Sequence, residues 1–209
     1  MGVSPKTRGR PKKLDRDAVL ECAVMAYWRN GPADVSVNDI CQIVQASKPG
    51  IYREFGNDDG LKLAALEAYQ GLAVQPFLDV FQHDRPMQIT VQEVIAFLMQ
   101  DRDELGIPKG CLFVAMRAQQ NALGPQTVDY VQQLRRHVLT SFARWVEACK
   151  TQGAFRSDIS TSSAAHIIDA LHSGAMRMQT ETVAAAEIEA FLTSGFALMT
   201  DKTTGQTKE

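Results

Sequence analysis

The sequence predicts an all-α protein. Apolar side chains recur at helical spacing through most of the 209 residues, as at Val19, Ala23 and Tyr27, whereas the alternation typical of strands is scarce. Gly, Pro and capping residues divide the chain into about nine helical segments. Apolar residues make up 45% of the chain, so we expect a folded globular protein rather than a disordered one.

Three short helices are expected near the N-terminus. The first spans about 15–30 and ends before Gly31, since glycine suits a helix C-terminus. The second follows Ser36, an N-cap residue with Asp39 three positions on, which is an acidic variant of the capping box. The third follows Ser47 and carries a proline in its first turn, where proline is tolerated.

Six further helices are expected to complete the fold. Asn57 caps the fourth, which continues to about residue 81. The remaining five are expected at about 89–102, 109–122, 125–152, 160–181 and 184–200. We expect a domain organisation of a flexible basic arm, a helix-turn-helix domain, a ligand-binding and dimerisation domain, and a flexible tail, at residues 1–14, 15–56, 57–200 and 201–209.

The charge is distributed unevenly along the chain. There are 22 Lys and Arg against 24 Asp and Glu, a formal net charge of −2. Residues 1–13 hold five basic side chains and no acid, which leaves an acidic excess on the rest of the chain. The sequence therefore combines a basic arm with an acidic body, and the basic end is the one suited to nucleic acid.

The second and third helices fit a helix-turn-helix, whose second helix lies in the major groove of DNA. Lys48 and Arg53 are suited to phosphates or guanine edges, and the Tyr52 hydroxyl is suited to a phosphate. Gly50 would let the helix approach the duplex closely, while Ile51 and Phe55 would face the interior.

Residues 16–62 resemble the DNA-binding domain of the TetR family of transcriptional repressors. The specific part of the resemblance is the register of five residues, Ser47, Ile51, Tyr52, Phe55 and Leu61. The resemblance implies a homodimer on a pseudo-palindromic operator in double-stranded DNA, and release of the DNA when a small molecule fills a pocket in the C-terminal part. The matching positions that it implies for DNA contact are Ser36, Ser47, Lys48, Tyr52 and Arg53.

Three positions depart from the family pattern. Gln45 stands in the turn, where the family usually has glycine, and a positive φ there would cost about 1 kcal/mol. Asp58 stands where the family usually has a lysine, which removes one expected phosphate contact. Gly50 replaces a side chain that often reads bases, so we expect little base reading by this helix.

The basic arm offers a second mode of DNA contact. Its Arg-Gly-Arg-Pro segment resembles an AT-hook core, and Arg8 and Arg10 would lie in an A·T-rich minor groove. The alternative is a solvated basic tail that adds only salt-sensitive attraction.

The C-terminal part contains candidates for a ligand pocket. An aromatic and Met-rich set suits an apolar or aromatic effector, and Arg117 could pair with an anionic group on it. For each of these residues, ordinary core packing is the alternative. The candidates are Phe113, Met116, Arg117, Phe142, Trp145, Met176 and Met178.

Small residues alternate with large ones in the last two helices, which allows close helix packing. The resemblance favours a four-helix dimer interface built from these two helices of each protomer. The alternative is packing within one chain only.

Cys111 is expected at the start of a helix, beside Lys109, where the helix dipole and the lysine would lower its pKa. That setting suits a redox or electrophile sensor, and the alternative is a small buried apolar residue. His166, Asp169 and His172 are spread too far around one helix to converge easily on a metal.

No catalytic motif or cofactor motif is found, so we expect neither an enzyme nor a bound cofactor. The chain has no apolar run of about 18 residues and no secretory signal, which favours the cytoplasm and reduced cysteines. The sequence thus predicts a ligand-responsive repressor. The alternatives are a repressor that senses oxidants or electrophiles through Cys111 and a helical small-molecule carrier that does not bind DNA.

Overall fold

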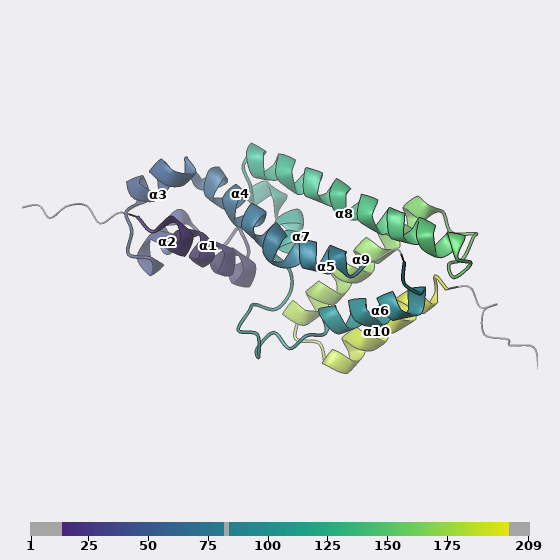
Figure 1. The fold of residues 1–209 in the computed structure, drawn as a ribbon. Helices are drawn as coiled ribbons and strands as arrows, with labels where there is room; N and C mark the ends of the chain where they lie inside the picture. The colour runs from purple at the N-terminus through teal and green to yellow at the C-terminus, as the bar shows by residue number, and fades with distance from the viewer. Residues whose placement is uncertain (1–13, 82–83, 201–209) are drawn as a thin grey trace, which may run out of the picture.

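The computed structural model describes residues 14–81 and 84–200. Three short helices form the N-terminal head: α1 (Arg16–Asn30), α2 (Val37–Ile43) and α3 (Lys48–Phe55). Ser36 and Ser47 cap α2 and α3 as the sequence predicts, since each hydroxyl accepts a bond from a backbone amide of the first turn. The head lies at one end of the molecule (Figure 1).

A long interrupted rod joins the head to the rest of the protein. It consists of α4 (Asp58–Tyr69), a π-helical segment (Gln70–Val74) and α5 (Gln75–Asp79). Pro76 explains the π segment, because it has no amide to donate to the carbonyl four residues back and its ring would clash there. The rod therefore changes its helical register where it leaves the head.

The body contains five helices and one short 3₁₀ turn. These are α6 (Met87–Leu98), α7 (Leu112–Ala118), the turn Gln120–Ala122, α8 (Pro125–Thr151), α9 (Thr161–Thr180) and α10 (Ala185–Ala197). The long α8 runs beside both α4 and α9, while α10 packs against α9 and α6 (Figure 1). Counting the interrupted rod once, the described residues form nine helices, and their only β pairing is an isolated bridge.

A loop at 99–111 separates α6 from α7. The helices expected from the sequence at about 89–102 and 109–122 extend further into this segment than α6 and α7 do. Two glycines with positive φ, Gly106 at 66° and Gly110 at 80°, prevent helix on both sides of Pro108. A Cβ at Gly110 would lie 2.6 Å from the Thr180 side chain, so this close approach of loop to α9 requires glycine. The loop is thus held against the body.

The Asp59 carboxylate in α4 fixes the head side of the rod to the body. It accepts hydrogen bonds from the Gln126 and Thr127 amides at 2.9 and 3.1 Å, which caps the first turn of α8. The Lys62 ammonium also donates to the carbonyl of Ala122 at 2.7 Å. The Asp59 bonds thus join α4 directly to the start of α8.

None of the helices in the described ranges combines the length and the apolar character that crossing a membrane requires.

Candidate DNA-contacting face and ligand cavity

The helix α3 presents a polar face over a buried apolar one. Ile51 and Phe55 point into the head core, with exposed fractions of 0% and 8%. Lys48 and Arg53 are exposed, as is Ser47, whose hydroxyl accepts from the Gly50 amide at 3.2 Å. The two cationic side chains are therefore available to an external anionic surface.

Gly50 is placed differently from its neighbours. It is buried, and a Cβ there would lie 3.1 Å from the Ser47 hydroxyl. Its lack of a side chain therefore avoids a close contact at the start of α3, and the residue offers little surface to a duplex.

Tyr52 has a partner within the protein. Its hydroxyl donates to a carboxylate oxygen of Asp58 at the start of α4, and the Lys48 ammonium lies 5.2 Å from the centre of its ring. The bond to Asp58 raises the pKa of Tyr52 above its ordinary value, and burial adds to the rise. The hydroxyl can donate to a phosphate only after it leaves Asp58.

The other candidate DNA contacts lie at the edges of this face. Ser36 is exposed and forms the expected capping box, in which its hydroxyl and its amide both donate to Asp39, at 2.6 and 2.8 Å. Arg8 and Arg10 lie outside the described residues. At Gln45, φ is +52°, which is the left-handed conformation expected for this turn.

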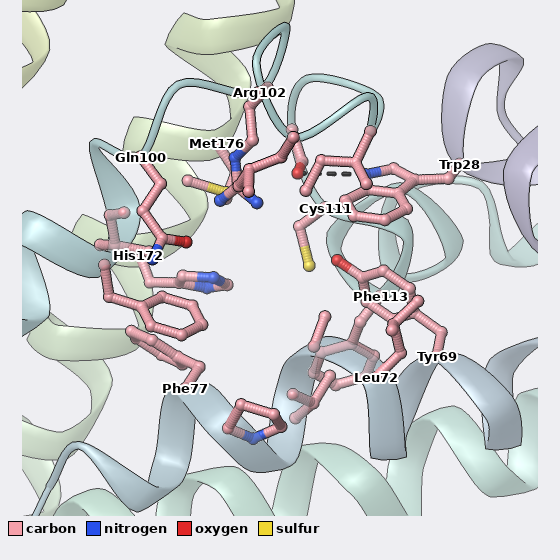
Figure 2. Close-up of a pocket in the computed structure, with 18 of the residues that line it drawn as sticks. Trp28, Tyr69, Leu72, Phe77, Gln100, Arg102, Cys111, Phe113, His172 and Met176 are labelled. Carbon is pink, nitrogen blue, oxygen red and sulfur yellow. Dashed lines mark hydrogen bonds between the residues drawn. The ribbon is translucent and has the colours of Figure 1, made fainter.

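A cavity of about 250 Å³ lies between the head, the rod and the body (Figure 2). Its wall residues come from α1, α4, the π segment, α5, α6, the 99–111 loop, α7, α8 and α9, and most of them are aromatic or apolar. Prominent lining residues are Trp28, Tyr69, Leu72, Phe77, Phe97, Gln100, Arg102, Cys111, Phe113, Asp169, His172 and Met176. Residues of the head thus share the cavity with residues of the body.

The structure places only some of the expected pocket residues at this cavity. Phe113 and Met176 line it. Met116, Phe142 and Trp145 instead form core, with exposed fractions of 0%, 0% and 1%. Helical periodicity identifies which residues are buried, but it does not distinguish a filled interior from the wall of a cavity.

Arg117 pairs within the protein. Its guanidinium donates to both Asp169 carboxylate oxygens, at 2.7 and 2.8 Å, and both side chains are largely buried. Because the Arg117 guanidinium is engaged in this bidentate pair, it is not free to bind the anionic group of an effector, as was expected from the sequence. Met178, the remaining candidate, is half-buried and is not part of the cavity wall.

Several of the lining residues are not predicted from the sequence. Trp28 and Tyr69 come from α1 and α4, which periodicity identifies only as apolar faces. Their rings make an edge-to-face contact with centroids 4.8 Å apart, and the Trp28 indole donates to the Gly110 carbonyl at 3.1 Å (Figure 2). Arg102 belongs to the 99–111 loop, which was expected to be partly helical.

His172 stacks on Phe77 at the cavity wall, with ring centroids 4.8 Å apart. Removal from water lowers its pKa to about 4, although nearby Asp169 opposes the shift. His166 is exposed on another side of the same helix. Within 14–81 and 84–200, no group of three or more His, Cys, Asp or Glu side chains is placed to hold a metal ion.

Cys111 is the N-cap residue of α7 and lines the cavity. Removal from bulk water raises the pKa of its thiol, although the Tyr69 hydroxyl and the first amides of α7 favour the thiolate. Lys109 pairs with Asp103 at 3.5 Å. The expected lowering of the Cys111 pKa is therefore wrong, because desolvation exceeds the effect of the helix terminus.

Comparison with known proteins identifies the family. Residues 90–194 match the family model for the tetracyclin repressor-like C-terminal domain, which covers half of the chain. The chain belongs to the TetR family. It is 30% identical over 110 residues to the HTH-type transcriptional repressor ComR of Escherichia coli (strain K12), over 52% of each protein. The chain thus spans about half the length of the curated relatives it matches.

Solved TetR-family structures share the fold over most of the chain. A transcriptional regulator of the TetR family from Agrobacterium tumefaciens has a TM-score of 0.78 at 19% identity, covering 89% of this chain and 97% of that one. A cysteine mutant of the TetR-family regulator CifR, in complex with 26-bp operator DNA, has a TM-score of 0.76 at 21% identity, covering 91% and 100%.

The last two helices pack closely within this TetR-family chain. Gly195 of α10 lies against Leu171 of α9, where a Cβ would come within 2.2 Å of the leucine side chain. Part of the small-residue pattern thus serves packing inside one chain. Ile167 on α9 and Leu198, the C-cap residue that follows α10, remain exposed, at 38% and 70%.

Proposed function

We propose that this protein is a ligand-responsive transcriptional repressor that acts in the cytoplasm as a homodimer on double-stranded DNA. The observation that carries the proposal is the polar face of α3, where Lys48 and Arg53 are exposed above the buried Ile51 and Phe55. Family membership supports it, as does the similarity to ComR, a transcriptional repressor.

In this proposal two α3 helices enter successive major grooves about 34–36 Å apart on a pseudo-palindromic site. Ser47, Lys48 and Arg53 meet the duplex from α3, and Ser36 lies near the backbone. Two-fold symmetry would bring α9 and α10 of each protomer together, and the exposed Ile167 and Leu198 suit that interface. Arg8 and Arg10 of the arm would lie in the flanking minor groove.

The cavity supports control by a small, largely apolar effector. A molecule there touches Trp28 of α1 and Tyr69 of α4, as well as the body helices α7 and α9. The binding free energy of the effector can thus differ between two positions of the head relative to the body. Such a difference is required for coupling between the cavity and the DNA-contacting face. The Asp59 bonds to α8 are one set of contacts that such a change would alter.

Fluorescence anisotropy with DNA from the region upstream of the protein's own gene tests the DNA-binding proposal. We expect a sequence-selective complex that weakens steeply with salt, and we expect Lys48→Ala and Arg53→Ala to weaken it and to lower the salt slope. Arg136→Ala, at an exposed site on α8, is the matched control and should leave binding unchanged. No salt-sensitive, selective complex would instead indicate a helical carrier.

The same assay separates a Cys111 sensor from a packing role. If the thiol senses oxidants, Cys111→Ser abolishes release of DNA by oxidant and keeps the DNA affinity. The raised pKa of the Cys111 thiol favours a packing role. If Cys111 only packs, Cys111→Ser releases DNA in response to effector as the wild type does.

A further inference from the structure

Arg102 is a cation at the cavity for which residues 14–81 and 84–200 supply no hydrogen-bond acceptor at Nε and no ion pair. Its Nε is buried. Figure 2 shows the guanidinium directed into the cavity beside Met176. A buried donor without a partner is costly, so this group is suited to an acceptor from outside the chain.

The other polar groups at the cavity do not neutralise this charge. Asp169 is committed to Arg117 through two short hydrogen bonds. His172 is uncharged at neutral pH, because its pKa is lowered to about 4. Burial raises the pKa values of Tyr69 and Cys111, so both are neutral as well.

The acidic residues of the 99–111 loop lie away from the cavity. Asp103 is exposed and pairs with Lys109 at 3.5 Å, while Asp101 accepts from backbone amides of its own turn and Glu104 is exposed. The positive charge of Arg102 acts on ionisable groups at the cavity wall. It favours lower pKa values for Tyr69, Cys111 and His172, in opposition to burial at Tyr69 and Cys111 and in the same direction as burial at His172. The cavity is therefore electropositive.

The walls select the rest of the ligand by shape. Phe77 and His172, whose rings stack, line one part of the wall, and Tyr69 and Trp28, whose rings meet edge to face, line another. A volume of about 250 Å³ is slightly below the roughly 300–1,000 Å³ typical of ligand pockets, which suits one ring or two fused rings. Flat aromatic molecules gain from such ring contacts beyond their buried area.

We propose that the cavity binds a small planar aromatic carboxylate, with the carboxylate on the Arg102 guanidinium and the rings between Phe77 and Trp28. Arg is suited to this role because its planar fork matches a carboxylate in a bidentate arrangement. The inference deepens the proposed function, since it names the chemical class of the effector. Arg102 lies on the loop whose Gly110 carbonyl holds Trp28 of α1, so the bound anion is linked to the head.

Isothermal titration calorimetry of the purified full chain, without DNA, tests this ligand class. The probes are 2-naphthoate and its uncharged counterpart 2-naphthamide. We expect the wild type to bind the acid about 10-fold or more tightly than the amide, as a charge-assisted hydrogen bond provides. Arg102→Gln should reduce acid affinity to that of the amide and leave amide affinity unchanged, and Arg102→Lys should retain part of the preference.

Lys109→Gln is the matched control, since it removes a positive charge from the same loop at an ion-paired, solvent-facing site, and it should keep the preference. Far-UV circular dichroism and thermal melts confirm that each variant is folded. Equal wild-type affinity for the two probes, no binding of either at millimolar concentration, or a preserved preference in Arg102→Gln would each overturn the proposal. These readouts do not involve DNA, so loss of DNA binding in the anisotropy assay would refute the proposed function while leaving the acid preference in place.

Discussion

Replacing Asp58 by asparagine should strengthen DNA binding. Asp58 holds the Tyr52 hydroxyl and places a negative charge beside the face that meets phosphates. In the wild type, the Tyr52 hydroxyl must leave the Asp58 carboxylate to donate to a DNA phosphate. Both acceptors are anionic, so the exchange contributes little binding free energy. In Asp58→Asn the hydroxyl leaves a neutral amide instead, and the repelling charge is gone.

The magnitude follows from the strengths of these hydrogen bonds. Bonds to charged groups contribute about 1.5–3 kcal/mol and neutral ones about 0.5–1.5 kcal/mol, so the exchange gains about 1 kcal/mol per protomer. Two reading heads give about 2 kcal/mol, or about a 30-fold lower Kd. Stability should fall slightly, by about 0.3–1 kcal/mol, because Asp58 lies at the positive end of α4.

Anisotropy titrations at fixed salt measure the effect. Asp129→Asn, which removes an exposed acid from α8, should change affinity little. The double variant Tyr52→Phe/Asp58→Asn should lose most of the gain, since the hydroxyl is absent. An unchanged or weaker affinity in Asp58→Asn would refute the view that this carboxylate restrains Tyr52.

Three further substitutions test the fold. Gln45→Gly should stabilise the protein by about 1 kcal/mol, because φ is +52° there, and raise Tm by about 2–4 °C in calorimetry; an unchanged Tm contradicts the strain argument. Asp59→Ala should cost about 1–2 kcal/mol in denaturant unfolding, because α8 loses its cap, whereas a loss below 0.5 kcal/mol, on the order of an exposed site, opposes that role. The His172 pKa is about 4 when folded and near 6.5 when unfolded, so the unfolded chain binds the proton first and stability falls as pH drops from 6.5 to about 4, by at most about 3 kcal/mol. His172→Phe should remove that part of the pH dependence, and identical pH profiles for variant and wild type would show that His172 is not its source.

The helices of the head were predictable because their signals are local. Ser36, Ser47 and Asn57 each accept a hydrogen bond from the amide three residues on, so the sequence alone indicates where α2, α3 and α4 begin. The same holds for the positive φ at Gln45, which depends on the turn itself.

The cavity depends on contacts between distant segments, so it was only partly predictable. The partner of Arg117 lies 52 residues away, and the Trp28 indole bonds to a carbonyl 82 residues away. Periodicity shows that Phe142 and Phe113 are both apolar interior residues, but only their contacts with distant segments place Phe142 in the core and Phe113 at the cavity wall. The pKa of Cys111 likewise depends on burial by elements far from it in the sequence.

A hydroxyl-radical footprint on the upstream DNA tests the central claim of a dimeric operator-binding repressor most directly. The proposal predicts two protected patches on a pseudo-palindromic site, about 34–36 Å apart along one face of the duplex. Protection should fade when an effector fills the cavity. A single patch, or uniform protection without sequence preference, would contradict the claim.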